Sequence, residues 1–83
     1  MQFPAVTIYT TKTCQYCKAT KDLLHKHNVP FDEIDVGADP TKAREMIEKS
    51  GQMGVPVIFI GDDADKQMII GFDESALRHA LSL

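Results

Sequence analysis

Cysteine, tryptophan and long apolar runs are scarce in this chain of 83 residues. It has two cysteines and no tryptophan. It also has no run of about 18 apolar residues, the length needed to cross a bilayer. Small domains that depend on disulfides for stability are usually dense in cysteine, so we do not expect a disulfide scaffold. The first residues, Met1 to Pro4, lack the charged and apolar regions of a signal peptide, and we therefore expect a cytoplasmic protein without a membrane partner.

An excess of positive charge is also missing. Twelve acidic and nine basic residues give a formal net charge of −3, which provides no field for attracting nucleic acid or anionic lipid. The composition, with 43% hydrophobic and 25% charged residues, is that of an ordinary globular protein. The length fits one domain over residues 1–83, and we expect it to act as a monomer.

The two cysteines stand three positions apart, in Cys14-Gln15-Tyr16-Cys17. Residues at this spacing lie on one face at the start of a helix, close enough for a disulfide to open and close. The same spacing can supply half of a zinc site, but structural zinc needs two further ligands, and no histidine or carboxylate has a matching paired spacing. We therefore predict reversible redox chemistry and no metal ligands.

The hydrophobic pattern predicts alternating strands and helices in the order βαβαββα. Asp39 and Asp73 are placed to cap the second and third helices, and Gly51 to end the second. A turn over residues 61–65 would join the last two strands. In chain order, the expected elements are a strand at 3–9, a helix at 15–27, a strand at 31–36, a helix at 40–50, strands at 57–60 and 67–70, and a helix after residue 73.

The expected start of the first helix gives the two sulfurs different roles. Cys14 lies where unpaired N–H groups and the helix dipole stabilise a thiolate, and Lys12 and Lys18 add positive charge nearby. Cys17 lies one turn into the helix, where access is poorer. We therefore expect Cys14 to attack a substrate disulfide and Cys17 to resolve the mixed disulfide. Tyr16 is expected to be exposed beside the reactive sulfur.

A second motif, Gly54-Val55-Pro56, precedes the third predicted strand. Together with the cysteine motif and the element order, it makes the chain resemble the glutaredoxin family of the thioredoxin superfamily over essentially its whole length. The resemblance implies a thioredoxin-like α/β fold, with a four-stranded mixed sheet flanked by three helices. It also implies that the Val55–Pro56 bond is cis and faces the active sulfur, so that Val55 pairs with the substrate backbone. Base rates alone would favour a trans bond.

The same resemblance implies a glutathione site formed by Lys12, Tyr16, Gln52, Asp73 and Glu74. Lys12, with Gln52, would attract the glycine carboxylate, and Asp73 with the N–H groups of the last helix would hold the γ-glutamyl end. Glutathione would then be a co-substrate, with no tightly bound cofactor. A structural alternative stays open, because Asp73 is also a helix cap and Glu74 a favourable acid in a first turn.

Two departures from the glutaredoxin pattern leave the electron donor open. Gln15 replaces the proline common in the motif, and Gly71-Phe72 resembles the corresponding stretch of NrdH-type redoxins, which are reduced by thioredoxin reductase. Those proteins continue with Arg-Pro where this chain has Asp73-Glu74. We therefore include Gly71 and Phe72 among the candidate substrate-binding residues, and keep both glutathione and thioredoxin reductase as possible donors.

The expected activity is that of a dithiol thiol–disulfide oxidoreductase acting on disulfide-containing or glutathionylated proteins. An alternative from a different class is an iron–sulfur carrier, in which two chains share a cluster through Cys14 and glutathione. The presence of Cys17 argues against that alternative.

Overall fold

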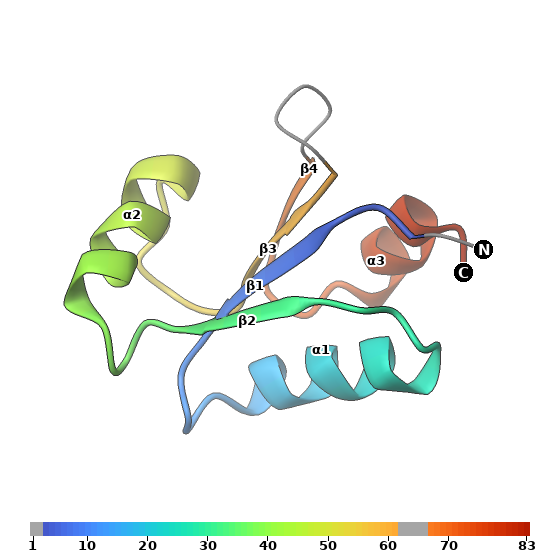
Figure 1. Ribbon diagram of the computed structural model, residues 1–83, viewed down its shortest axis with the longest axis horizontal. Coiled ribbons are helices and arrows are strands. Elements are labelled where there is room, and N and C mark those ends of the chain that lie inside the picture. The colour runs from blue at the N-terminus through green and yellow to red at the C-terminus, as the bar shows by residue number, and fades with distance from the viewer. Residues whose placement is uncertain (1–2, 62–66) are drawn as a thin grey trace.

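The computed structural model describes residues 3–61 and 67–83, which form the predicted βαβαββα order (Figure 1). The acidic part of the expected turn, residues 62–65, lies outside the described residues. The elements are β1 (Val6–Thr10), α1 (Gln15–Lys26), β2 (Asp32–Asp35), α2 (Pro40–Ser50), β3 (Val57–Ile60), β4 (Gln67–Ile70) and α3 (Glu74–Leu81). No helix in the described part of the chain is both long and apolar enough to cross a membrane.

The strands form a four-stranded mixed sheet in the order β2-β1-β3-β4. β1 pairs parallel with β2 and antiparallel with β3, with Ile8 opposite Ile58, and β3 pairs antiparallel with β4. The parallel pair needs a crossover connection, which α1 provides. The predicted thioredoxin-like sheet is therefore confirmed, with β1 at its centre and both cysteines at the start of the crossover helix.

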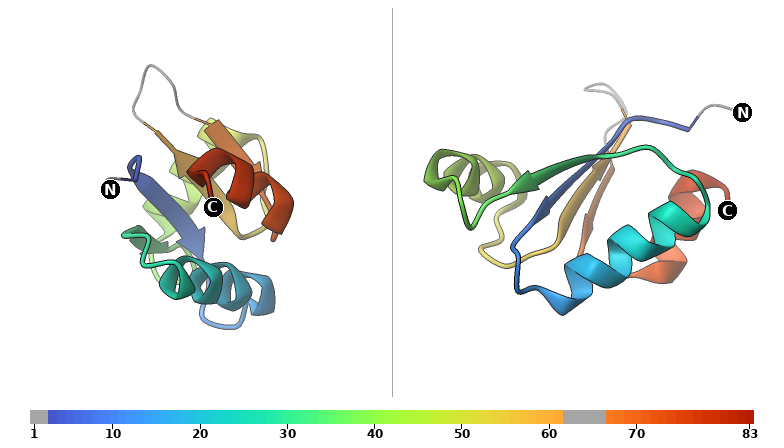
Figure 2. Two further views of the ribbon diagram at one scale, coloured as in Figure 1. Left: turned by 90° about the vertical axis from the view of Figure 1, so that its right-hand side faces the viewer. Right: turned by 60° about the horizontal axis from the view of Figure 1, so that its bottom comes forward.

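Side chains of a strand point alternately to its two faces, so the sheet separates two apolar clusters. α1 and α3 pack on one face and α2 on the other, as Figure 2 shows with α1 and α3 in front of the sheet in its left view. The first cluster consists of Val6, Ile8, Leu23, Leu24, Val29, Ile58, Ile60, Ile69, Leu77 and Leu81. The second consists of Tyr9, Val36, Met46, Val57 and Phe59.

The helix ends follow the expected capping residues. Asp39 accepts hydrogen bonds from the N–H groups of Thr41 and Lys42, and Pro40 is the first helical residue of α2. Gly51 ends α2 with a φ of 70°, a left-handed conformation that glycine adopts without a steric penalty.

The first strand is shorter at its start than the sequence suggests. Val6 is the first residue paired across the sheet, opposite Ile60, whereas residues 3–5 lie outside the strand. Pro4 has no N–H to donate to a ladder, and Phe3 instead packs against the α1/α3 cluster. β1 extends one residue beyond the prediction, to Thr10, which brings its end close to the cysteine motif.

Candidate active site

Cys14 caps the N-terminus of α1 with its sulfur. Its backbone is extended, with φ −80° and ψ 115°, and its Sγ accepts a hydrogen bond from the Cys17 N–H at 3.0 Å. The Cys14 N–H donates to the carbonyl of Thr11 at 3.3 Å, which fixes the loop after β1. Ser, Thr, Asp and Asn usually fill this position because a side-chain acceptor satisfies a free N–H. In this chain a redox-capable atom performs that task.

The surroundings of the Cys14 sulfur favour negative charge. The first turn of α1 contains no acidic residue, so the positive end of the helix dipole is not neutralised there. Cys14 is partly exposed, which leaves its sulfur accessible to another molecule. The Cys17 N–H and the N-terminal end of α1 both present positive partial charge to the Cys14 sulfur.

Cys17 has the opposite environment, because it is 1% exposed and belongs to the protein interior. Burial raises the pKa of the Cys17 thiol to about 12, with further raising contributions from the hydrogen bond and the charge of Cys14. The backbone of Thr11 and the charge of Lys21 act in the opposite direction. At neutral pH, Cys17 is therefore a protonated thiol beside a surface sulfur, and both cysteines are free.

Val55 and Pro56 lie against the Cys14 sulfur. The bond between them is cis, as the resemblance implies, and the Cys14 thiol donates to the Val55 carbonyl at 3.7 Å. The Pro56 carbonyl accepts from the Gly71 N–H at 2.9 Å, which connects this segment to the end of β4. No described residue accepts a hydrogen bond from the Val55 N–H. Val55 therefore contacts the sulfur through its carbonyl and has a backbone N–H that no described residue uses.

Lys12, Tyr16 and Gln52 are exposed around this end of the sheet. Tyr16, between the cysteines, is 65% exposed, as expected. Gln52 lies in the segment between α2 and Val55, and the neighbouring Met53 is 83% exposed, a large apolar side chain that the sequence analysis did not single out. The start of α1 and this segment lie at the same end of the sheet (Figure 2, right). The segment between α2 and Val55 therefore exposes an apolar side chain at this end of the sheet.

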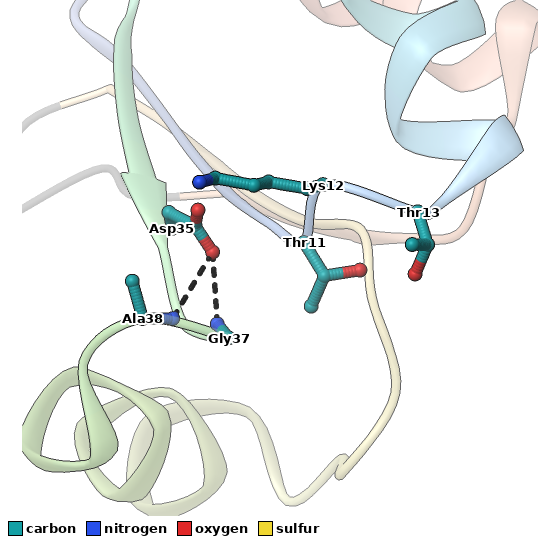
Figure 3. A pocket seen from close by; sticks show the side chains of 6 residues that line it. All are labelled: Thr11, Lys12, Thr13, Asp35, Gly37 and Ala38. Atoms are coloured by element: carbon teal, nitrogen blue, oxygen red, sulfur yellow. Dashed lines mark hydrogen bonds between the residues drawn. The ribbon is translucent and has the colours of Figure 1, made fainter.

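Lys12 belongs to a pocket of about 270 Å³ next to the cysteine motif. Its lining residues are Thr11, Lys12, Thr13, Asp35, Gly37 and Ala38. Figure 3 shows the Lys12 side chain extending away from Thr13, toward the side of the pocket that carries Asp35. One oxygen of Asp35 accepts hydrogen bonds from the N–H groups of Gly37 at 2.9 Å and Ala38 at 3.3 Å. Polar side chains from Thr11, Lys12, Thr13 and Asp35 line part of the pocket, which opens beside the loop that leads to Cys14.

The residues at the start of α3 have structural contacts of their own. Asp73 accepts a hydrogen bond from the Ala76 N–H at 3.1 Å and so caps α3. Glu74 forms an ion pair with Arg78 at 2.8 Å. Phe72 packs against the α1/α3 cluster, and Gly71 has a φ of 78°. Among these four residues, Gly71 has the most direct connection to the cysteines, through its hydrogen bond to Pro56.

A group near Cys17 was not identified from the sequence. Lys21 lies one turn after Cys17 on α1 and pairs with Glu33 on β2 at 2.8 Å. The buried Thr10 hydroxyl donates to the same carboxylate oxygen at 2.7 Å. The spacing of four residues from Cys17 to Lys21 was a usable signal, since such residues share a helix face. The position of Glu33 depends on the pairing of β1 with β2, which the local sequence does not specify.

Metal-binding side chains do not gather in the described ranges, 3–61 and 67–83, where no group of three or more His, Cys, Asp or Glu residues could hold an ion. The groups that the described residues bring together are the thiols of Cys14 and Cys17, the N-terminus of α1 and the backbone of Val55.

Similarity to known proteins supports the same interpretation. The family model described as Glutaredoxin matches residues 6–64. Glutaredoxin 3 of Escherichia coli is 44% identical over 69 residues, which is 83% of this chain and 78% of that protein. The glutaredoxin-like protein NrdH of Lactococcus lactis is 39% identical over 62 residues, which is 71% of this chain and 81% of that protein. The NrdH-redoxin structure from Escherichia coli, whose activity profile is described as thioredoxin-like, superposes with a TM-score of 0.75 and 29% identity, covering 90% of this chain and 92% of that one.

Proposed function

The chain belongs to the glutaredoxin family, whose members are thiol–disulfide oxidoreductases, and we propose that it reduces protein disulfides and glutathione mixed disulfides through Cys14 and Cys17. The observation that carries the proposal is the unequal pair of sulfurs. Cys14 is partly exposed and accepts the Cys17 N–H at 3.0 Å, whereas Cys17 is buried and protonated at neutral pH. We place this activity in the cytoplasm, where a dithiol is kept reduced.

The first step is attack by the Cys14 thiolate on a substrate disulfide. One substrate sulfur forms a mixed disulfide with Cys14, and the other leaves as a thiolate that takes a proton from water. Val55 supports this step because its carbonyl lies 3.7 Å from the Cys14 sulfur and its N–H is unpaired among the described residues, so an extended substrate backbone can pair with it.

The second step closes the Cys14–Cys17 disulfide. Cys17 loses its proton to solvent and attacks the Cys14 sulfur, and the second substrate thiol is released. The two electrons that reduce the substrate thus come from the two thiols of this chain. The hydrogen bond between Cys14 Sγ and the Cys17 N–H supports this assignment, since it keeps the two residues adjacent in the dithiol form.

Substitution of each cysteine tests these roles. Cys14→Ser should abolish reduction of a protein disulfide and of a glutathione mixed disulfide. Cys17→Ser should abolish the first reaction and preserve deglutathionylation, which needs one thiol. Full protein-disulfide reductase activity in Cys14→Ser would overturn the assignment of the nucleophile.

We propose glutathione as the electron donor, on the basis of Lys12, Tyr16 and Asp73. Tyr16 is exposed between the cysteines, Lys12 is exposed two residues before Cys14 and lines the neighbouring pocket, and Asp73 caps the start of α3. Reduction by thioredoxin reductase is the second candidate, favoured by Gly71-Phe72 and by the similarity to NrdH proteins. Reduction of the oxidised chain should be measured with glutathione plus its reductase and, separately, with thioredoxin reductase. Failure of glutathione together with rapid reduction by thioredoxin reductase would select the second candidate.

A further inference from the structure

Three hydrogen-bonded side chains, Thr10, Glu33 and Lys21, connect the buried end of β1 to the part of α1 that follows Cys17. The Thr10 hydroxyl, 1% exposed at the end of β1, donates to Glu33 Oε2 at 2.7 Å. The same oxygen accepts from Lys21 Nζ at 2.8 Å. Three elements thereby fix one ammonium group: β1 through Thr10, β2 through Glu33 and α1 through Lys21. Lys21 is four residues after Cys17, so both side chains lie on one face of α1.

The Lys21 ammonium, paired with Glu33, adds a positive charge one turn along α1 from Cys17. The charge of Lys21 lowers the pKa of Cys17, against the larger raising effect of burial, and Cys17 in turn contributes to the raised pKa of Lys21. The pKa of Cys17 is also affected by Cys14 and by the backbone of Thr11. Beyond them, Asp22 acts on Lys21 and His25 on Glu33. Lys21 is the side-chain cation that acts on Cys17 among the described residues.

Glu33 is unsuited to accept the Cys17 proton. Its hydrogen bonds with Lys21 and Thr10 hold the pKa of its carboxyl below the usual value, which makes it a weak base. Lys21 therefore affects Cys17 through its positive charge. Glu33 and Thr10 hold that charge in place.

We propose that Lys21 accelerates the resolving step by stabilising the Cys17 thiolate, with Glu33 and Thr10 as positioning residues. This inference rests on the proposed two-cysteine reaction. In the step concerned, the Cys17 S–H bond breaks and its proton passes to solvent. The Cys17 thiolate then forms a bond to Cys14 Sγ, the bond from Cys14 to the substrate sulfur breaks, and that sulfur leaves with the electron pair and takes a proton from water. Lys21 keeps its own proton throughout.

The two steps can be observed separately with the chromogenic disulfide of nitrothiobenzoate in stopped flow. Equal amounts of reduced protein and this reagent release one coloured thiolate when Cys14 attacks and a second when Cys17 resolves. Lys21→Gln should leave the first phase unchanged and slow the second about fivefold at neutral pH, the size expected for a partly exposed charge. The pH profile of the second phase should move to higher pH in this variant. High salt should bring the second-phase rates of Lys21→Gln and wild type closer together, because salt screens the charge of Lys21.

Three further variants separate charge from structure. Lys21→Arg should retain the wild-type second phase, because it keeps the charge. Lys26→Gln, the same change on an exposed position later in α1, should leave both phases unchanged. Glu33→Gln should slow the second phase roughly twofold if it frees Lys21 to move into solvent. Acceleration in Glu33→Gln would overturn the positioning role, since it would mean that Glu33 merely neutralises Lys21.

A second phase in Lys21→Gln that matches wild type in rate and pH profile would overturn the proposal for Lys21. This result is distinct from failure of the proposed function. If the wild-type chain released no second thiolate at all, the two-cysteine reaction itself would be wrong.

Discussion

The Sγ atom of Cys14 accepts the N–H of Cys17 at 3.0 Å, so the two redox residues are joined by a hydrogen bond before any disulfide forms. One sulfur is at the surface and the other is 1% exposed. Their chemical difference follows from where the backbone places them, since both belong to the first turn of one helix. Alkylation and alkaline unfolding test this difference, and substitutions at Asp73 and Lys12 test the proposed glutathione site.

Alkylation should distinguish the two thiols. Brief treatment of the reduced, folded chain with iodoacetamide near neutral pH should add one group, and peptide mass spectrometry should locate it on Cys14. Cys17 is buried and its pKa is about 12, so it has little thiolate to react. In the Cys14→Ser variant, modification should be at least about tenfold slower. Equal labelling of both cysteines in the folded wild type would contradict the assigned environments.

Alkaline pH should weaken the fold through Cys17. The folded pKa of this thiol, about 12, exceeds the ordinary value of 9.0. As pH rises, the Cys17 thiol loses its proton in the unfolded chain first, so the free energy of unfolding falls from about pH 9 toward 12. Below about pH 9, Cys17 is protonated in both states and its contribution to stability does not change with pH. Urea unfolding of reduced wild type and Cys17→Ala should show a shallower decline in the variant. Parallel declines would show that Cys17 does not cause the effect.

The two roles of Asp73 can be separated by paired substitutions. Asp73→Ala should lower the free energy of unfolding by about 1 kcal/mol, because it removes the cap on the Ala76 N–H. Asp73→Asn retains a capping oxygen and should leave stability nearly unchanged. If Asp73 also binds glutathione, Asp73→Asn should have a higher KM for glutathione without a loss of stability. An unchanged KM would leave Asp73 as a cap alone.

The charge of Lys12 should matter for glutathione and little for stability. Lys12→Gln should raise the KM for glutathione about fivefold, as expected for the loss of one exposed charge contact. Thermal unfolding should be unaffected, since Lys12 is exposed. Lys26→Gln is the matched control for the loss of charge and should leave the KM for glutathione unchanged. A KM equal to wild type in Lys12→Gln would remove Lys12 from the site.

Helix ends and the buried strand β3 could be predicted from the sequence, because they depend on residues close together in the chain. Asp39, Gly51 and Asp73 end or begin helices as their residue types indicate, because a cap needs a side chain or a backbone conformation at one position. The run of apolar residues in β3 likewise indicated a strand buried on both faces, and Val57–Ile60 is buried throughout.

Features that depend on contacts between distant parts of the chain could not be predicted from the local sequence. The cis bond before Pro56 followed from family resemblance, whereas base rates favoured trans. The contact of Lys21 with Glu33 depends on β2 lying beside β1, and its two residues are 12 positions apart in the chain. The start of β1 at Val6 depends on where its partner strand ends.

The Val55 carbonyl gives the site a dependence on oxidation state. In the dithiol chain this oxygen accepts the Cys14 S–H at 3.7 Å. Once Cys14 forms a disulfide the sulfur has no hydrogen to donate, and the oxygen loses that partner. A peptide N–H approaching Val55 therefore competes with the S–H while Cys14 is protonated and meets a free acceptor once Cys14 is in a disulfide. A ligand that uses this oxygen will bind the protonated dithiol and the disulfide with different affinities, and by linkage its binding will shift the reduction potential of the cysteine pair.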